Sequence, residues 1–132
     1  DHLEAHAMAE EKYFYPTLLQ LGKGALDSDS ADETTEDAID DHNKIANAAD
    51  AALNEEVGSD AWWKCVDKAN YQNSAHLSEE ERQGLTDFRR RVPLERRIAL
   101  GIKYLAFEAD HVTNVEREEK DPDAYIEENE AA

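Results

Sequence analysis

Two histidine–glutamate pairs recur in the chain with the same spacing: His6 stands four residues before Glu10, and His76 four residues before Glu80. Residues four apart lie one turn apart on the same face of a helix, so each pair would point an imidazole and a carboxylate in one direction. Helical bundles use such groups, on facing helices, to hold two metal ions. The repeated spacing therefore predicts a metal site between helices.

A third histidine, His42, lies at the centre of an apolar stripe that includes Ile39 and Ile45, so it should point inward. Taken alone, an inward histidine is more often a neutral core residue that hydrogen-bonds to a neighbour. Three helices that each aim a histidine inward, two of them with a carboxylate one turn on, favour metal binding over core packing. Neighbouring carboxylates point elsewhere and are expected to be solvated: Glu11, Glu79 and Glu81.

The elements that would position these groups are helices. Only 5 glycines and 3 prolines occur in 132 residues, which argues against a loop-rich or all-β fold. Apolar residues at helical spacing predict four helices, over residues 1–22, 36–56, 60–90 and 93 to about 115. Pro16 falls inside the first, so a kink or distorted turn is expected near Tyr15. Short connections imply antiparallel neighbours, so we expect an all-α, up-down four-helix bundle.

We expect one domain over residues 1–115, followed by an acidic tail of marginal structure over residues 116–132. Because the helical pattern is already present at Asp1, we also expect natural residues upstream, and with them any targeting segment.

The composition restricts the partners. A formal net charge of -18 argues against binding to nucleic acid or to an anionic membrane surface. The single cysteine excludes an internal disulfide framework and fits a reducing compartment, so we expect a cytoplasmic protein. No apolar run in the sequence is long enough to span a bilayer.

The ligand set also restricts the metal. A mixture of imidazole and carboxylate without thiolate disfavours a structural zinc site. Cys65 falls on the inner side of its helix, but a lone cysteine is more often a small core residue than a ligand. Bundles with this ligand chemistry commonly hold two iron or two manganese ions, and the number of histidines favours iron.

Residues 6–16 (HAMAEEKYFYP), Asp41-His42 and residues 76–81 (HLSEEE) resemble the hemerythrin-like, HHE cation-binding family, over about residues 1–90. The resemblance implies a hemerythrin-like bundle with a non-haem di-iron centre, an oxo or hydroxo bridge, and an open position on one iron. It implies that three histidines ligate iron and two glutamates bridge the ions: His6, His42, His76, Glu10 and Glu80.

The family normally supplies another histidine from a helix before the first motif, and that region is absent from this sequence. Either it was lost upstream, or another histidine substitutes for it. His111 is the main candidate to replace it, because it shares an inward-looking stripe with Tyr104 and Phe107. The alternative is a partly buried histidine on a helix that packs against a missing helix or a second subunit. His2 shares the stripe of His6 but lies at a helix end that frays.

Tyr13 is a second departure from the family, which more usually has an aliphatic residue there. Its position three residues after Glu10 points the phenol toward the metals. A phenolate ligand would favour ferric iron, and so redox chemistry over reversible oxygen carriage. The alternative is an ordinary core tyrosine whose hydroxyl is satisfied by a carboxylate.

Three functions therefore compete. The first is a di-iron protein that binds a small oxidant (dioxygen, peroxide or nitric oxide), with peroxidase-type or nitric-oxide-oxidising turnover. The second is a non-catalytic module for oxygen or iron binding, storage or sensing. The third is a structural bundle whose acidic faces and Trp62-Trp63 pair contact other proteins.

Overall fold

The computed structural model describes residues 1–25, 30–113, 115–116 and 118–130. All regular secondary structure in these residues is helical, which confirms the all-α prediction. The elements are α1 (His2–Ala9), η1 (Glu10–Phe14), α2 (Tyr15–Leu21), α3 (Ala31–Leu53), α4 (Asp60–Arg82), α5 (Gly84–Arg91), α6 (Leu94–His111) and α7 (Pro122–Glu130). Part of the loop that separates α2 from α3, residues 26–29, lies outside the described residues.

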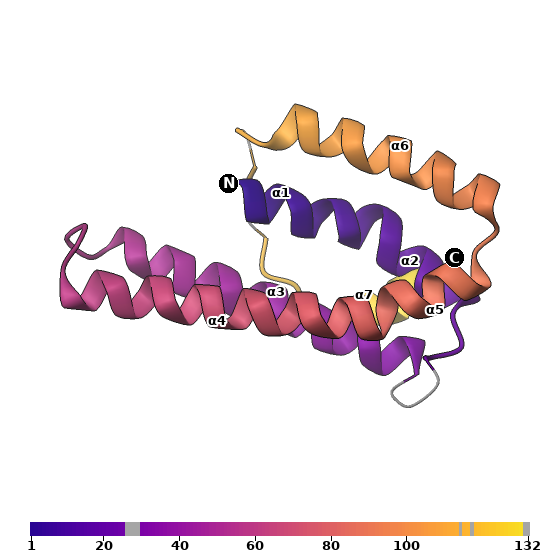
Figure 1. Cartoon of the computed structure of the whole chain (residues 1–132), viewed down its shortest axis with the longest axis horizontal. Helices are drawn as coiled ribbons and strands as arrows, with labels where there is room; N and C mark the ends of the chain where they lie inside the picture. The colour runs from indigo at the N-terminus through magenta and orange to yellow at the C-terminus, as the bar shows by residue number, and fades with distance from the viewer. Residues whose placement is uncertain (26–29, 114, 117, 131–132) are drawn as a thin grey trace.

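Helices α3 and α4 form a long antiparallel hairpin, visible along the lower part of Figure 1. Each helix begins at a serine that accepts a hydrogen bond from a backbone amide of its own first turn. Ser30 accepts from the Glu33 amide in a capping box, and Ser59 accepts from the Trp62 amide. Gly58, with φ +86°, supplies the left-handed residue in the turn between the helices. This hairpin is the base on which the site is built.

The first segment of the chain, which comprises α1, η1 and α2, does not run as one regular α-helix. Between α1 and α2 the chain forms η1, a single turn of π-helix, which leads directly to Pro16 at the start of α2. Proline has no amide hydrogen and its ring excludes the carbonyl four residues before it, so a wider turn accommodates it. The predicted distortion near Tyr15 is confirmed. It matters for the site because Glu10 and Glu11 belong to this turn.

The remaining helices pack around the first segment. Helix α6 makes its main contacts with α1 and η1, on the side away from the α3–α4 hairpin, as Figure 1 shows. Helix α5 packs against α2 and α3, and it is separated from α4 by a break at Gln83. The short connections predict a regular four-helix bundle, and this bundle is not confirmed. Helix α6 makes its main contacts with α1 and η1 and not with the α3–α4 hairpin.

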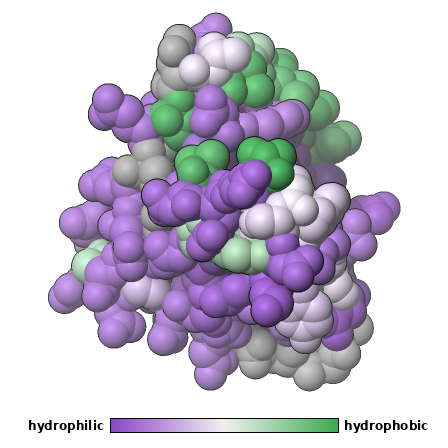
Figure 2. All heavy atoms as spheres, turned by 90° about the vertical axis from the view of Figure 1, so that its left-hand side faces the viewer, coloured by the Kyte–Doolittle hydropathy of each residue, from purple (hydrophilic) through white to green (hydrophobic). Residues whose placement is uncertain are grey.

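One face of α6 remains apolar and uncovered by the described residues. Its exposed side chains are Leu94, Ile98, Ile102 and Leu105, each between 55% and 66% exposed. Figure 2 shows apolar surface in the upper part of the molecule, where α6 lies. The opposite face, with Tyr104 and Phe107, packs against the first segment.

The acidic C-terminal segment differs most from expectation. Residues 122–130, expected to belong to a tail of marginal structure, form α7, which packs against α2 and α3. Asp121 begins this helix by accepting a hydrogen bond from the Ala124 amide at 2.9 Å. A single aromatic residue, Tyr125, is buried by the packing, and one buried residue in a short acidic helix leaves no periodic pattern in the sequence.

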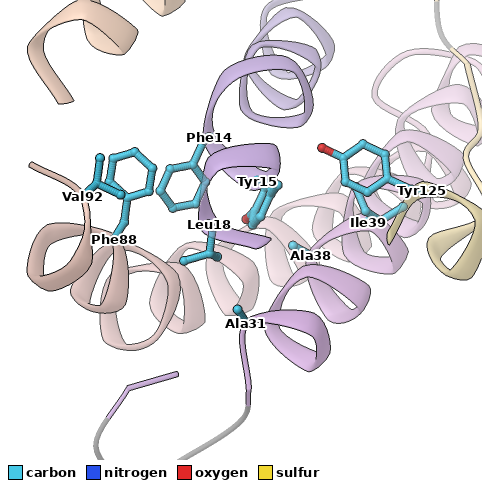
Figure 3. Close-up of a cluster of buried hydrophobic side chains, with 9 residues drawn as sticks. All are labelled: Phe14, Tyr15, Leu18, Ala31, Ala38, Ile39, Phe88, Val92 and Tyr125. Carbon is cyan, nitrogen blue, oxygen red and sulfur yellow. The ribbon is translucent and has the colours of Figure 1, made fainter. Parts of the chain in front are cut away.

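The main hydrophobic core joins five of these elements. Figure 3 shows its residues, which are Phe14, Tyr15, Leu18, Ala31, Ala38, Ile39, Phe88, Val92 and Tyr125. Buried Asp87 fastens α5 to the end of α2 by accepting hydrogen bonds from the amides of Lys23 and Gly24, at 2.9 and 2.7 Å. Gly22 is required beside it, because a Cβ there would lie 2.6 Å from the Asp87 carboxylate. The core thus fixes the end of η1 against the hairpin.

Candidate metal centre

The four residues of the repeated motifs come together with His42 where four elements of the fold meet. They come from α1, η1, α3 and α4, and form two groups that could each hold a metal ion. One group contains Glu10, His42 and His76. The other contains His6, Glu10 and Glu80, so the two groups share Glu10. Within each group, the candidate ligand atoms all lie within 4.8 Å of one another.

The first group is buried. His42 Nε2 lies 3.1 Å from His76 Nε2 and 3.1 Å from Glu10 Oε2, while His76 Nε2 lies 3.9 Å from the same oxygen. Although it is in ion-pair contact, Glu10 Oε2 accepts no well-directed hydrogen bond from any described residue. A buried carboxylate oxygen without a hydrogen bond is costly, and a cation between these three atoms would remove that cost.

The second group uses the other oxygen of the shared glutamate. His6 Nε2 lies 2.8 Å from Glu10 Oε1. Glu80 completes the group, and its Oε1 accepts a hydrogen bond of 3.0 Å from the Tyr15 hydroxyl. Tyr104 closes the side toward α6, with its hydroxyl 2.7 Å from His6 Nδ1. Each oxygen of Glu10 therefore faces a different histidine set, as expected of a carboxylate that bridges two ions.

The outer ring nitrogens show a regular pattern. Each histidine turns Nε2 toward Glu10 and Nδ1 toward a different carboxylate outside the two groups. The outer contacts are His6 Nδ1 to Glu108 at 2.7 Å, His42 Nδ1 to Glu11 at 2.9 Å and His76 Nδ1 to Asp41 at 3.6 Å. Histidines that bind metals almost always place their second nitrogen against such a group, which fixes the tautomer and raises the basicity of the ligand nitrogen.

Without a metal, this arrangement favours protonated histidines. The hydrogen bond to Glu10 raises the pKa of His6 to about 9. Burial lowers the pKa of His76, but Asp41 and Glu10 outweigh burial and raise it to about 10. Burial would raise the pKa of Glu10 itself, but the close contacts with the His42, His6 and His76 imidazoles hold that pKa well below its usual value. Protons and metal cations therefore compete for the same nitrogens.

Glu80 behaves differently from Glu10. Burial, together with the negative charge of Glu10, raises the pKa of Glu80 above its usual value. The two carboxylates repel each other across the site, and a cation between them would relieve that repulsion.

Two cavities reach the candidate ligands from different sides. One, of about 370 Å³, touches His42 and His76 and has apolar walls from α1 and α3, including Leu3 and Ile45. The other, of about 340 Å³, is lined by His6, Glu10 and Glu80 together with further residues of η1, α4, α5 and α6. A molecule of a few atoms can therefore approach the cluster through largely apolar surroundings.

The other predicted ligands do not join the cluster. His111 stacks on the ring of Phe107, with centroids 3.9 Å apart, and its Nδ1 donates to the Phe107 carbonyl at 2.8 Å. His2 is exposed at the start of α1. Tyr13 packs edge-on against Phe107 and lines the second cavity without belonging to either ligand group. Whether any of the three touches metal stays a prediction.

Several residues of the site were missed or misplaced by sequence reasoning. The expectation that Glu11 is solvated was wrong, because its side chain is only 9% exposed and contacts His42. Tyr15 was noted only for the distorted turn, although its hydroxyl donates to Glu80. Glu108 was not considered, although it lies one turn after Tyr104 on the inward stripe of α6.

The two tyrosines offer a direct comparison. Tyr15→Phe should lower the free energy of unfolding of the metal-free protein by about 1–3 kcal/mol, because it removes a buried donor to Glu80. Tyr13→Phe should cost about 0.5 kcal/mol or less, since Tyr13 is half-buried and its hydroxyl has no such partner among the described residues. Urea titration of both variants checks this. Equal losses would show that the Tyr15 hydroxyl is not specially placed.

Comparisons of the chain with protein-family models, with curated proteins and with solved structures found no match. Among the described residues, no helix combines the length and the apolar character needed to cross a membrane. The functional assignment therefore depends on the site itself.

Proposed function

We propose that this chain is a hemerythrin-like di-iron protein that binds a small oxidant, such as dioxygen, peroxide or nitric oxide. In this proposal Glu10, His42 and His76 hold one iron, and His6, Glu10 and Glu80 hold the other. The observation that carries it is the orientation of the three histidines, each with Nε2 toward the shared glutamate and Nδ1 against its own outer carboxylate. Core packing does not require that repeated arrangement.

The donor set supports iron. Nitrogen and carboxylate oxygen donors without thiolate suit iron and manganese, and three histidines in one cluster favour iron. A di-iron centre would supply binding and reduction of a small oxidant at an open coordination position. The chain contributes the rest: Glu10 balances charge between the two groups, and the apolar cavity walls limit water around the histidines.

Metal analysis tests the proposal. Protein expressed in iron-replete medium should contain about two iron ions per chain, and an anomalous-scattering map at the iron edge should place them beside the two residue groups. His42→Ala should lower the iron content while leaving helicity largely intact. Iron near zero in the wild-type protein, or unchanged iron in His42→Ala, would contradict the proposal. The structural bundle would then be the better description.

Turnover requires a separate measurement. If the protein is an oxidoreductase, the iron-loaded form should consume peroxide or nitric oxide in the steady state faster than the same amount of free iron. Stoichiometric binding without consumption would instead assign the site to oxygen or iron binding, storage or sensing.

The visible spectrum of the same samples tests whether Tyr13 binds iron. A charge-transfer band that is lost in Tyr13→Phe would identify the phenol as an iron ligand, and an unchanged spectrum in that variant would show that it is not one.

A further inference from the structure

The carboxylate next to the shared glutamate faces the same histidine from the other side. Glu10 Oε2 lies 3.1 Å from His42 Nε2, and Glu11 Oε1 lies 2.9 Å from His42 Nδ1. Two consecutive residues of η1 therefore contact both nitrogens of one imidazole ring. Because the ring is buried, these two contacts fix the orientation of the imidazole, with Nε2 toward Glu10 and Nδ1 toward Glu11.

The C-terminal segment holds Glu11 in this place. Lys120 Nζ forms an ion pair with the second carboxylate oxygen, Glu11 Oε2. The hydroxyl of Tyr125 in α7 donates to the backbone carbonyl of Glu11. A glutamate that lies next to a candidate ligand is thus held through its side chain and its backbone by residues more than 100 positions away in sequence.

The segment is also fastened beside His42. The Asn43 side chain donates from Nδ2 to the Lys120 carbonyl at 2.7 Å and accepts from the Lys120 amide at 3.3 Å. This pair of hydrogen bonds fixes the backbone of Lys120 next to His42, and the ion pair with Glu11 places its ammonium group. The lysine is one of two basic residues in the acidic segment 116–132.

A buried carboxylate needs such a counter-charge. The Glu11 side chain is only 9% exposed, and its two carboxylate oxygens contact the His42 imidazole and the Lys120 ammonium group. Removing Lys120 would leave Glu11 with one partner in a poorly solvated position, where it could turn toward water or release the imidazole. The lysine therefore acts on His42 through Glu11.

We propose that the C-terminal segment is a positioning device for the metal centre, in which Lys120 and Tyr125 hold the Glu11 carboxylate against His42 Nδ1 so that Nε2 faces Glu10. This inference rests on the proposed function for its metal-binding consequence. The orientation of His42 can be measured without any metal. Glu11 and Lys120 are positioning residues, since neither belongs to the two ligand groups.

The test compares Glu11→Gln and Lys120→Met with two controls, Lys120→Arg and Lys68→Met. Lys120→Arg retains the positive charge, and Lys68 is an exposed lysine on α4. Titration with Co²⁺ followed by visible absorption should show a 10–100-fold weaker affinity in Glu11→Gln and Lys120→Met, a typical loss when a group behind a histidine ligand is removed. The controls should stay close to wild type.

Nitrogen-15 NMR of the metal-free proteins gives the second readout. Wild-type protein should show hydrogen on His42 Nδ1 at a pH where the ring is neutral, and Glu11→Gln and Lys120→Met should show an altered or mixed tautomer. An unchanged tautomer together with unchanged Co²⁺ affinity would overturn the positioning role. If wild-type protein itself fails to bind metal, the proposed function fails, but the tautomer comparison still supports or overturns the contact from Lys120 to His42.

Discussion

Glu10→Gln is expected to reduce iron binding from about two ions per chain to nearly none. Glu10 is the one residue common to both ligand groups, and its two oxygens face opposite histidine sets at 2.8 and 3.1 Å. A glutamine has the same shape, but it lacks the negative charge and presents one oxygen instead of two. Both halves of the site should therefore weaken together, with a loss of at least 100-fold in affinity as the measured effect. Iron analysis and Co²⁺ titration check this.

Two controls make the result specific. Glu36→Gln removes one negative charge from an exposed position on α3, and iron content should not change. Glu80 belongs to one group alone, and not to both as the family resemblance implies, so about one iron per chain should remain in Glu80→Gln. Retention of one tightly bound ion in Glu10→Gln would show that Glu10 does not bridge. The two groups would then have to be treated as separate sites.

The candidate ligands were predictable because their spacing is local. His6 and Glu10 share a helix face through the four-residue period, as do His76 and Glu80, and His42 is marked by the apolar residues around it. The structure brings all five together. The distorted turn near Tyr15 was equally predictable, because the restriction that proline places on a helix is local too.

The residues that were missed act over long sequence distances. Glu11 looked solvated because a regular helix turns it away from Glu10, and nothing local indicates that Lys120 will lie beside it. The acidic C-terminal segment has no apolar periodicity, although Tyr125 and Lys120 connect it to η1. Contacts of this kind depend on tertiary packing, which a hydrophobic pattern does not encode.

The position of α6 illustrates the same limit. Its sequence is apolar on two faces, and this pattern left open whether both faces pack within the chain. In the structure one face contacts α1 and η1 and supplies Tyr104 and Glu108 to His6. The four-helix prediction took short connections to mean a closed bundle, but connection length does not specify which neighbour a helix chooses.

Metal loading is expected to stabilise the protein, and the gain should grow as the pH rises from about 6 to about 9. In the metal-free protein, folding raises the pKa of His6 to about 9 and that of His76 to about 10, from 6.5. A raised pKa contributes stability that is complete below the unfolded value of 6.5 and is lost as pH rises through the folded values. Stability of the metal-free protein should therefore fall by about 1–3 kcal/mol over this range.

Glu10 has the opposite dependence in the metal-free protein. Its lowered pKa contributes stability above the unfolded value of 4.5, and this stability is lost as pH falls through the folded value. The metal-free protein should consequently be most stable between about pH 4.5 and pH 6.5. Metal binding requires deprotonated imidazoles, so iron affinity should be weak in that window and should increase as the histidines lose their protons.

Thermal unfolding of metal-free and iron-loaded protein at about pH 5.5, 7 and 8.5 measures both effects. Metal at 100 times its Kd contributes about 2.7 kcal/mol per site, so two sites should raise the melting temperature by roughly 10–20 °C at the highest pH and by little at the lowest. Glu10→Gln should show neither the metal gain nor the full alkaline loss, because the histidines no longer face a carboxylate at Nε2 and keep only the outer carboxylates at Nδ1. If the stability of the metal-free protein stays constant between pH 6 and 9, these imidazoles are neutral and hydrogen-bonded to their neighbours. That result would remove the electrostatic reason for placing cations among them.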